Sequence, residues 1–210
     1  MVQKTMEQEL HYFVDNTRQQ MELLYQLYGS TNFFREAISL IREVQRTGGR
    51  LHVSGIGNMH HAAGYCASLL SSLGEPAYFL DGTEATHGSS GQVAPGDLVI
   101  CLSYYGSVEE LNRAITALKA NGARILSLTG FDESWIARQS DVHLKVFIAE
   151  EGDPLNRPPR MSVLSSLFCF QCLSLCLQSE RSLDMEAYLR WHPAGVIGKS
   201  KLQAETRREE

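Results

Sequence analysis

The chain has 210 residues, of which 43% are hydrophobic and 20% charged, a composition typical of a globular protein with one substantial core. Its net charge of −5 argues against a nucleic-acid-binding groove, because contact with a phosphate backbone needs a concentrated basic face. The N-terminus carries charges and lacks an apolar stretch followed by a cleavage site, so we expect a cytoplasmic protein without a secretory signal.

Two helices are expected first. Apolar residues recur at helical spacing over residues 6–27, and a Gly-Ser-Thr segment at residues 29–31 interrupts them. A second amphipathic pattern covers about residues 32–46 and ends at Thr47-Gly48-Gly49.

Beyond residue 50, short apolar runs of strand length alternate with helical segments. The expected strands are residues 51–55, 77–80, 97–103, 123–130 and 142–148, and the helices between them lie near residues 59–73, 108–120 and 133–138. This alternation indicates a mostly parallel sheet covered on both faces. The predicted fold class is therefore α/β, a three-layer α/β/α sandwich with a five-stranded sheet and an N-terminal helical extension.

Residues 161–178 form a long run without charge, followed by a short helix near residues 183–190. We expect a buried helix rather than a membrane span, because the run contains Ser, Gln and Cys and barely reaches spanning length. Cys169, Cys172 and Cys176 share one face of this helix, and they are expected to pack as small apolar residues rather than to bind a metal. The odd total of five cysteines favours a reducing compartment.

Three parts of the chain are expected. Residues 1–47 would form helices that pack on the main domain, residues 48–202 the domain itself, and residues 203–210 a charged, solvated tail. The two N-terminal helices and the long helix carry more apolar faces than one sheet can cover, so we expect a homodimer or homotetramer.

The loop after the first strand contains Ser54, Gly55, Gly57 and Asn58. Its glycines would let the backbone approach an anion at the N-terminus of the next helix. The third glycine of a dinucleotide-binding fingerprint is missing, so no nicotinamide cofactor is expected. A tight turn without a ligand remains the alternative.

The loop after the third strand contains Ser103, Gly106 and Ser107. Ser107 and Glu110 match the S-x-x-E capping box, which would explain them without a ligand. Capping does not explain Ser103 or Gly106, and hydroxyls at this position could bind phosphate oxygens.

Four segments resemble the SIS (sugar isomerase) domain of arabinose 5-phosphate isomerases, over about residues 18–202. In chain order they are GIGN, FLDGTEATHGSSGQVAPGDLVICLSYYGSVEEL, ILSLTGFDESWIARQSDVHLKV and HPAGVIGK. The resemblance implies the SIS fold, a small-molecule sugar phosphate as ligand, no cofactor, and conversion of D-arabinose 5-phosphate to D-ribulose 5-phosphate. The pair of CBS domains usual in that family would begin about where this chain ends, so the SIS module alone is implied.

The resemblance also implies roles for individual residues. His87 and His192 match the two active-site histidines of the family, and Glu151, with Glu150 beside it, matches a carboxylate near the end of the last strand. The implied division of labour gives proton transfer to His87 and Glu151, and ring opening or substrate positioning to His192. The substrate-binding candidates are Ser54, Gly55, Gly57, Asn58, His61, Ser103, Gly106, Ser107, Arg160 and Ser162.

Three departures from the family pattern keep other functions open. Asn58 stands where the family has lysine, Ser107 where it has glutamate, and residues 160–163 retain a single hydroxyl, that of Ser162, from a Ser/Thr-rich stretch. Losing one electrostatic contact to the transition state costs about 2–4 kcal/mol, although Arg160 could restore the charge. The chain could therefore be a catalytically impaired sugar-phosphate sensor or regulator, or the isomerase of a different sugar phosphate.

The other histidines carry weaker signals. His61 could line the sugar pocket, whereas His60 is expected at the surface or as part of a helix start. A zinc site built from these two with His87 and His192 lacks metal-ligand spacing, so no metal is expected. His11, His52 and His143 lie in a helix and strands and are expected to be structural.

Overall fold

The structure is a computed structural model that describes residues 5–195. One sheet of five parallel strands has the order β2-β1-β3-β4-β5. Its strands are β1 Leu51–Gly55, β2 Ala77–Asp81, β3 Leu98–Leu102, β4 Arg124–Thr129 and β5 Val142–Lys145. Every expected strand is present within a few residues, and the predicted α/β class is confirmed. The charged tail expected at residues 203–210 lies outside the described residues.

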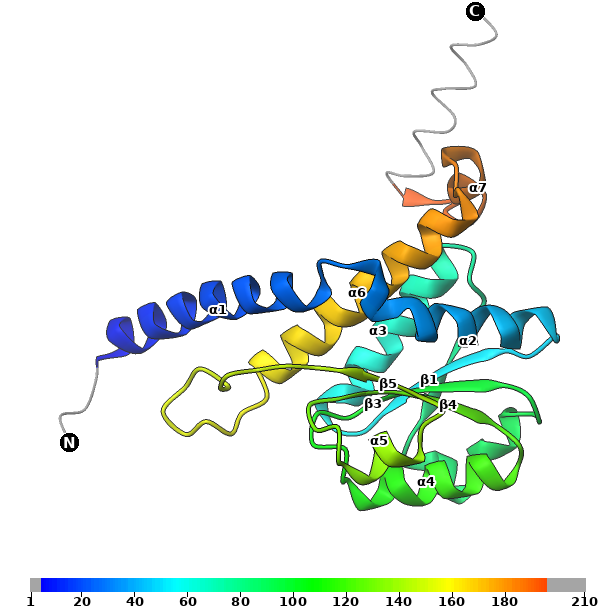
Figure 1. The fold of residues 1–210 in the computed structure, drawn as a ribbon, viewed down its shortest axis with the longest axis horizontal. Helices are drawn as coiled ribbons and strands as arrows, with labels where there is room; N and C mark the ends of the chain where they lie inside the picture. The colour runs from blue at the N-terminus through cyan, green and yellow to red at the C-terminus, as the bar shows by residue number, and fades with distance from the viewer. Residues whose placement is uncertain (1–4, 196–210) are drawn as a thin grey trace, which may run out of the picture.

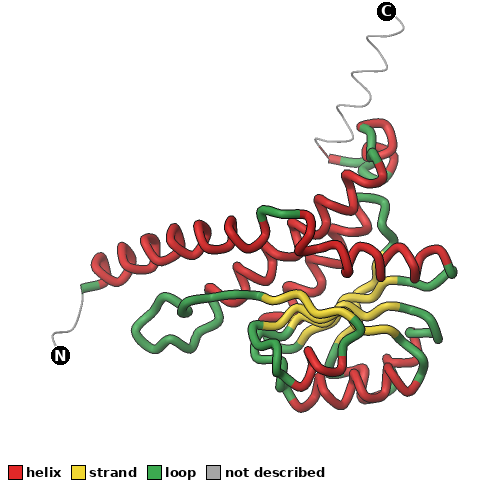
Figure 2. Tube along the Cα trace, in the orientation of Figure 1, coloured by secondary structure: helices red, strands yellow, loops and turns green. Residues whose placement is uncertain are grey.

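Helices cover both faces of the sheet, which makes three layers (Figure 1). One face carries α2 Arg35–Arg46, α3 Asn58–Ser72 and α6 Met161–Arg181, joined by the C-terminal end of α1 Met6–Tyr28. The other carries α4 Glu109–Ala120, α5 Trp135–Gln139 and the 3₁₀ segments η2 Glu84–His87 and η3 Ser89–Gln92. A further 3₁₀ turn, η1 Thr31–Phe34, joins α1 to α2, and α7 Met185–Arg190 follows α6. Figure 2 shows these helices on either side of the strands.

The central strand β3 shows why two layers of helices are needed. Its alternate residues Leu98, Ile100 and Leu102 enter the core beneath α2, α3 and α6, whereas Val99 and Cys101 enter the core beneath α4 and α5. All five residues are fully buried. A parallel strand with both faces covered is apolar throughout, as this sequence is.

The helix α1 packs only by its C-terminal end. Gln20, Leu24 and Tyr28 are its buried residues, and the N-terminal part projects from the domain (Figure 1). Met6, Leu10 and Val14 lie four residues apart on that projecting part and are more than half exposed, at 87%, 58% and 56%. This apolar stripe therefore has no partner among the described residues of the chain.

The long helix α6 has the length and apolar composition that a membrane span would have, and half of its most apolar stretch is buried inside the domain. It packs on α1, α2 and α3. Cys169 lies in the core, with Cys172 and Cys176 against it, and Cys66 and Cys101 are buried free thiols. The prediction that the cysteines pack as apolar residues is confirmed. Packing of α6 against the domain also explains why residues 161–178 carry no charge.

Candidate functional site

The strand order places the candidate site. Because β1 lies between β2 and β3, the chain leaves the end of β1 toward one side and the end of β3 toward the other. In open parallel sheets the crevice at such a reversal, beyond the carboxyl ends of the strands, is where ligands bind. Gly55 and Leu102 are paired across β1 and β3, so the two loops named from the sequence start side by side.

The first loop is a tight connection into α3. Gly57 has φ +64°, and a Cβ on Gly55 would lie 2.6 Å from the backbone oxygen of Met59, so both glycines are needed for the turn itself. α3 then begins at Asn58, which is exposed. Ser54 is buried, and its hydroxyl makes no hydrogen bond with the described residues.

The second loop is shaped by its glycine. Gly106 has φ +61°, and a Cβ there would lie 2.3 Å from Oγ of Ser134, so this position must be glycine. The predicted capping box is wrong: α4 starts at Glu109, its N-cap residue is Val108, and no side chain caps it. Ser107 is exposed instead, because the left-handed turn at Gly106 shifts the start of the helix.

The loop from residue 146 to residue 160 forms a third wall. Pro158 and Pro159 lie just before α6, and the Glu151 carboxylate accepts a hydrogen bond from the backbone N–H of Ser162 at 3.0 Å. Glu151 is 3% exposed, and its carboxylate satisfies one of the free N–H groups at the N-terminus of α6. The same loop contacts α1, where Gln20 bonds the backbone of Phe147 and Ala149.

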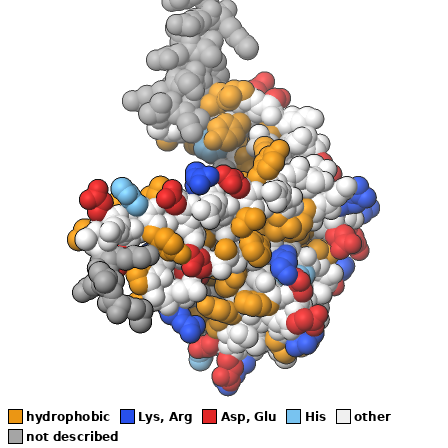
Figure 3. All heavy atoms as spheres, turned by 60° about the vertical axis from the view of Figure 1, so that its left-hand side comes forward, with side chains coloured by type: hydrophobic (Ala, Val, Ile, Leu, Met, Phe, Trp, Pro, Cys, Tyr) orange, Lys and Arg blue, Asp and Glu red, His pale blue; other side chains and the backbone are white. Residues whose placement is uncertain are grey.

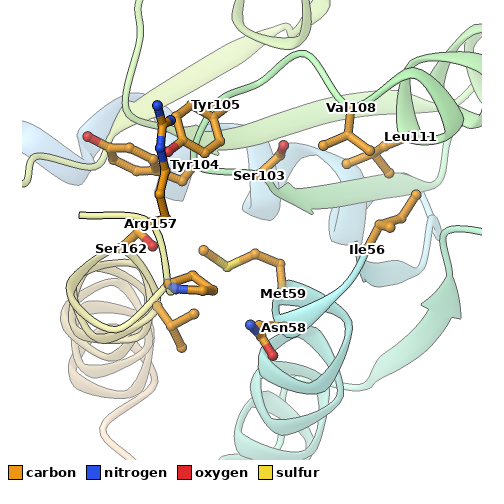
Figure 4. A pocket seen from close by; sticks show the side chains of 12 residues that line it. Ile56, Asn58, Met59, Ser103, Tyr104, Tyr105, Val108, Leu111, Arg157 and Ser162 are labelled. Atoms are coloured by element: carbon orange, nitrogen blue, oxygen red, sulfur yellow. The ribbon is translucent and has the colours of Figure 1, made fainter. Parts of the chain in front are cut away.

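These three loops enclose a pocket of about 200 Å³ (Figure 4). Three of the expected substrate-binding residues meet there: Asn58, Ser103 and Ser162. The other lining residues are Ile56, Met59, Tyr104, Tyr105, Val108, Leu111, Arg157, Pro159 and Val163. Half of the lining is thus apolar, and Arg157 is its single charged side chain.

Tyr104 is the lining residue with a clearly shifted pKa. Burial, with smaller contributions from the charges of Glu151 and Tyr105, raises the pKa of Tyr104 to about 12. Like any tyrosine it is protonated at neutral pH and can donate a hydrogen bond to a ligand, and the raised pKa extends this protonation further into the alkaline range. Tyr104, Tyr105 and Phe131 form one aromatic cluster, with ring centroids 5.3 to 6.1 Å apart, beside the pocket.

The histidines expected in the site lie outside this pocket. His87 is exposed and lines a separate hollow with Glu110 and Arg113 of α4. His61 is exposed on α3, with its ring against that of His60. Of the expected catalytic residues, Glu151 comes nearest, since its carboxylate bonds the backbone of a lining residue.

His192 lies at the far end of α3. The neighbouring Trp191 packs on Gly74, just beyond the C-terminus of α3, whereas the pocket includes Asn58 at its N-terminus. The 15 residues of α3 separate the two ends by about 22 Å. The imidazole stacks on Tyr188, with ring centroids 4.1 Å apart, and its Nδ1 lies 2.8 Å from the Tyr188 carbonyl. His192 therefore lies outside the pocket of its own chain, at the other end of α3.

Arg160 is also placed differently from the expectation. Its guanidinium pairs with Asp153 at 2.8 Å, and it does not line the pocket. The pocket cation is instead Arg157, three residues earlier. Sequence reasoning missed Arg157, Tyr104 and Tyr105, although the SYYGS segment already put two large aromatic residues between its serines.

Within residues 5–195, no three His, Cys, Asp or Glu side chains lie close enough together to hold a metal ion. Of the three histidines expected to be structural, His52 and His143 have side-chain hydrogen-bond partners. His52 bonds Asp97 at 3.1 Å, and His143 bonds Ser127 and Asp132.

Known proteins are similar to this chain in both sequence and fold. Residues 46–175 match the SIS domain family. The arabinose 5-phosphate isomerase KdsD of Shigella flexneri is 34% identical over 154 residues, which are 73% of this chain and 47% of that protein. The chain thus spans about half the length of the curated relatives it matches.

Solved structures agree on the architecture. The E. coli CFT073 protein c3406, in complex with a sugar phosphate, superposes with a TM-score of 0.77 and 27% identity, covering 88% of this chain and 95% of its own. A phosphoheptose isomerase from Francisella tularensis superposes with a TM-score of 0.67 at 14% identity, covering 84% of this chain and 100% of its own, which shows the fold alone. With its five-stranded parallel sheet and a pocket where the strand order reverses, the chain belongs to the SIS domain family.

Proposed function

We propose that this protein is a sugar-phosphate aldose–ketose isomerase with D-arabinose 5-phosphate as its leading substrate. The observation that carries the proposal is the pocket at the ends of β1 and β3, which gathers Asn58, Ser103 and Ser162. The relatives named arabinose 5-phosphate isomerase support the substrate class. The reaction moves a proton between C1 and C2 of the sugar and needs a base, a proton carrier for the oxygens, and stabilisation of an enediolate.

The pocket of one chain lacks the base. No carboxylate or imidazole of the described residues lines it, and Glu151 is buried with its carboxylate bonded to the N–H of Ser162. Within one subunit, His87 and His192 lie elsewhere. Catalysis in this pocket therefore requires a second subunit, whose His192 would act in the pocket of its neighbour.

The projecting α1 offers a surface for that assembly. Met6, Leu10 and Val14 form an exposed apolar stripe, and Figure 3 shows apolar side chains spread across the face at this end of the molecule. Burying the stripe against a second copy removes apolar area from water. We expect a homodimer or homotetramer at micromolar concentration in analytical ultracentrifugation, and a monomer under those conditions would contradict the proposal.

Subunit mixing tests the role of His192. The variants His192→Ala, which removes the imidazole, and Asn58→Trp, whose indole would fill the pocket, are expected to be inactive alone. If His192 works across the subunit boundary, each mixed interface has one intact site, made of the open pocket of the His192→Ala chain and the imidazole of the other chain. A 1:1 mixture of dimers should then regain about a quarter of wild-type activity. Mixed oligomers that form and stay inactive would contradict the assignment.

A second function is favoured by the same missing base. A sugar-phosphate sensor or regulator needs the pocket but no proton transfer, and Asn58 and Ser107 stand where the family pattern has lysine and glutamate. Turnover of a panel of pentose and hexose phosphates separates the alternatives. Ketose formation from arabinose 5-phosphate supports the first proposal, turnover of another sugar supports an isomerase of different specificity, and tight binding without turnover supports the sensor.

A further inference from the structure

We propose that Arg157 is the residue that binds the phosphate group in the pocket, supplying from the 146–160 loop the cation that Asn58 does not provide. This inference rests on the proposed sugar-phosphate ligand and names the group that recognises its charge.

The first support is the electrostatic isolation of Arg157. Nine of the arginines in residues 5–195 form ion pairs, and Arg35 bonds Asn32. Among the arginines of residues 5–195, only Arg46 and Arg157 have a guanidinium group that makes neither a hydrogen bond nor an ion pair with described residues. Arg46 ends α2, whereas Arg157 lines the pocket. A guanidinium presents five donors and stays charged at any physiological pH, so an unpaired one facing a cavity can bind an incoming anion.

The second support is the composition of the pocket. None of its twelve lining residues is acidic, so no side chain there neutralises Arg157. Ser103 and Ser162 add two hydroxyls, and Tyr104 adds a protonated phenol. A phosphate has three terminal oxygens, which can accept from the guanidinium fork and from hydroxyls together. Figure 4 shows Arg157 on the same side of the pocket as Tyr104 and Tyr105.

The third support is the bracing of the loop that holds Arg157. The Asn156 side chain accepts from the backbone N–H of Glu151 at 2.7 Å, and Asp153 accepts from Leu155 at 2.9 Å and from Arg160 at 2.8 Å. Pro158 follows Arg157 directly, which restricts the backbone of the arginine to extended conformations. Arg160 thus helps to hold the loop, and Arg157 is left available to a ligand.

These two arginines provide a matched experiment. The binding of inorganic phosphate, D-arabinose 5-phosphate, D-arabinose and D-arabinonate is measured by calorimetry at one ionic strength. The proteins compared are the wild type, Arg157→Gln, Arg157→Lys and Arg160→Gln. Thermal melts accompany each variant, and Arg157→Gln should melt like the wild type because its side chain makes no contact that folding needs.

Arg157→Gln should weaken binding of phosphate and of arabinose 5-phosphate about ten- to a hundredfold, the usual effect of losing a charge-assisted hydrogen bond. Arg157→Lys should recover part of that loss, because it restores the charge without the planar fork. Arg160→Gln should change affinity less than about threefold, because the hydrogen bonds of Asn156 with Glu151 and of Asp153 with Leu155 still hold the loop. D-arabinose should bind both Arg157 variants as it binds the wild type.

Three results would overturn the inference. The first is that the wild-type protein does not bind phosphate. The second is that Arg157→Gln binds phosphate as tightly as the wild type does, and the third is that Arg160→Gln loses as much affinity as Arg157→Gln. Arabinonate that binds as tightly as arabinose 5-phosphate, and with the same dependence on Arg157, would overturn the choice of phosphate over carboxylate. Failure of the proposed isomerase is distinguishable, since Arg157-dependent phosphate binding without turnover of any sugar removes the activity and supports the phosphate site.

Discussion

The two ends of the parallel sheet differ in whether their polar side chains are paired within the chain. At the amino ends the charges before or at the start of neighbouring strands pair with each other: Arg50 before β1 with Asp97 before β3, and Arg124 of β4 with Asp141 before β5. At the carboxyl ends, the Ser103 hydroxyl and the Arg157 guanidinium line the pocket and make no hydrogen bond with described residues. The four charges at the amino ends are thus paired within the chain and stabilise the fold. At the carboxyl ends some polar groups are also paired, such as Lys145 with Asp132, but those that line the pocket stay available for a ligand.

Asp97 is the centre of the amino end. It is 2% exposed and accepts hydrogen bonds from the backbone N–H groups of Arg50 and Ala94, from the Arg50 guanidinium, and from His52. Burial alone would raise the pKa of Asp97, but these donors outweigh it and lower the pKa to about 2.

The largest effect is expected for Asp97→Ala. Removing the carboxylate leaves the buried His52 ring and the backbone N–H groups of Arg50 and Ala94 without their acceptor, whereas the Arg50 guanidinium is 46% exposed and can turn to water. The free energy of unfolding should fall by about 3 kcal/mol, since each buried group left unsatisfied costs about 1–3 kcal/mol. Urea denaturation followed by circular dichroism measures it. The control is Asp141→Ala, whose side chain is 28% exposed and should cost less. Equal losses at the two positions would remove the distinction that burial makes within the amino end.

Acid should weaken the protein through the same residue. The folded-state pKa of Asp97, about 2, lies below its ordinary value of 3.8, so its stabilisation is complete above about pH 4 and is lost as the pH falls through 2. The shift corresponds to about 2 kcal/mol. Denaturant titrations of wild-type protein between pH 5 and 2 should show this loss, and Asp97→Ala should lack this component. A parallel decline in both proteins would mean that other carboxylates cause it.

At the carboxyl end, Ser103→Ala should separate binding from stability. The Ser103 hydroxyl makes no hydrogen bond with described residues, so the free energy of unfolding should change by less than about 0.5 kcal/mol. Affinity for arabinose 5-phosphate should fall about two- to tenfold, since one neutral hydrogen bond to the ligand is lost. Calorimetry and denaturation of the same variant test both statements. Lost stability with unchanged affinity would assign Ser103 to the fold.

Ser54→Ala is expected to have the smallest effect of these substitutions. Its hydroxyl is buried without a partner, so its removal should leave stability unchanged or raise it by about 1 kcal/mol at most. Ligand affinity should stay the same, because Ser54 does not line the pocket. Denaturation and calorimetry measure the two quantities. A weakly binding Ser54→Ala protein would show that this hydroxyl bonds the ligand, and a destabilised one would show that it has a partner in the fold.

Much of the site could be located from the sequence, but its chemistry could not. Glycines 55, 57 and 106 located both loops in the sequence, because tight turns require glycine at such positions. The same local reasoning failed at Ser107, since the positive φ of Gly106 moved the start of α4 past it. Local reasoning also named Arg160, and not Arg157, as the cation that binds the substrate. In the structure Arg160 pairs with Asp153, and this pairing depends on how the loop folds back on itself.

The sequence by itself determined the order of strands and helices along the chain, the parallel sheet and its burial on both faces. Apolar runs of strand length and a helical period of 3.6 residues are local properties of the chain, which is why they can be read from it. Only the tertiary structure decided which side chains share a space. It gathered Asn58 from the start of α3, Ser103 from the loop after β3 and Ser162 from the first turn of α6, and it left His87 on another surface. It placed His192 at the opposite end of α3, because Trp191 packs on Gly74 there. Such placements depend on contacts between residues far apart in the chain, which no local pattern contains.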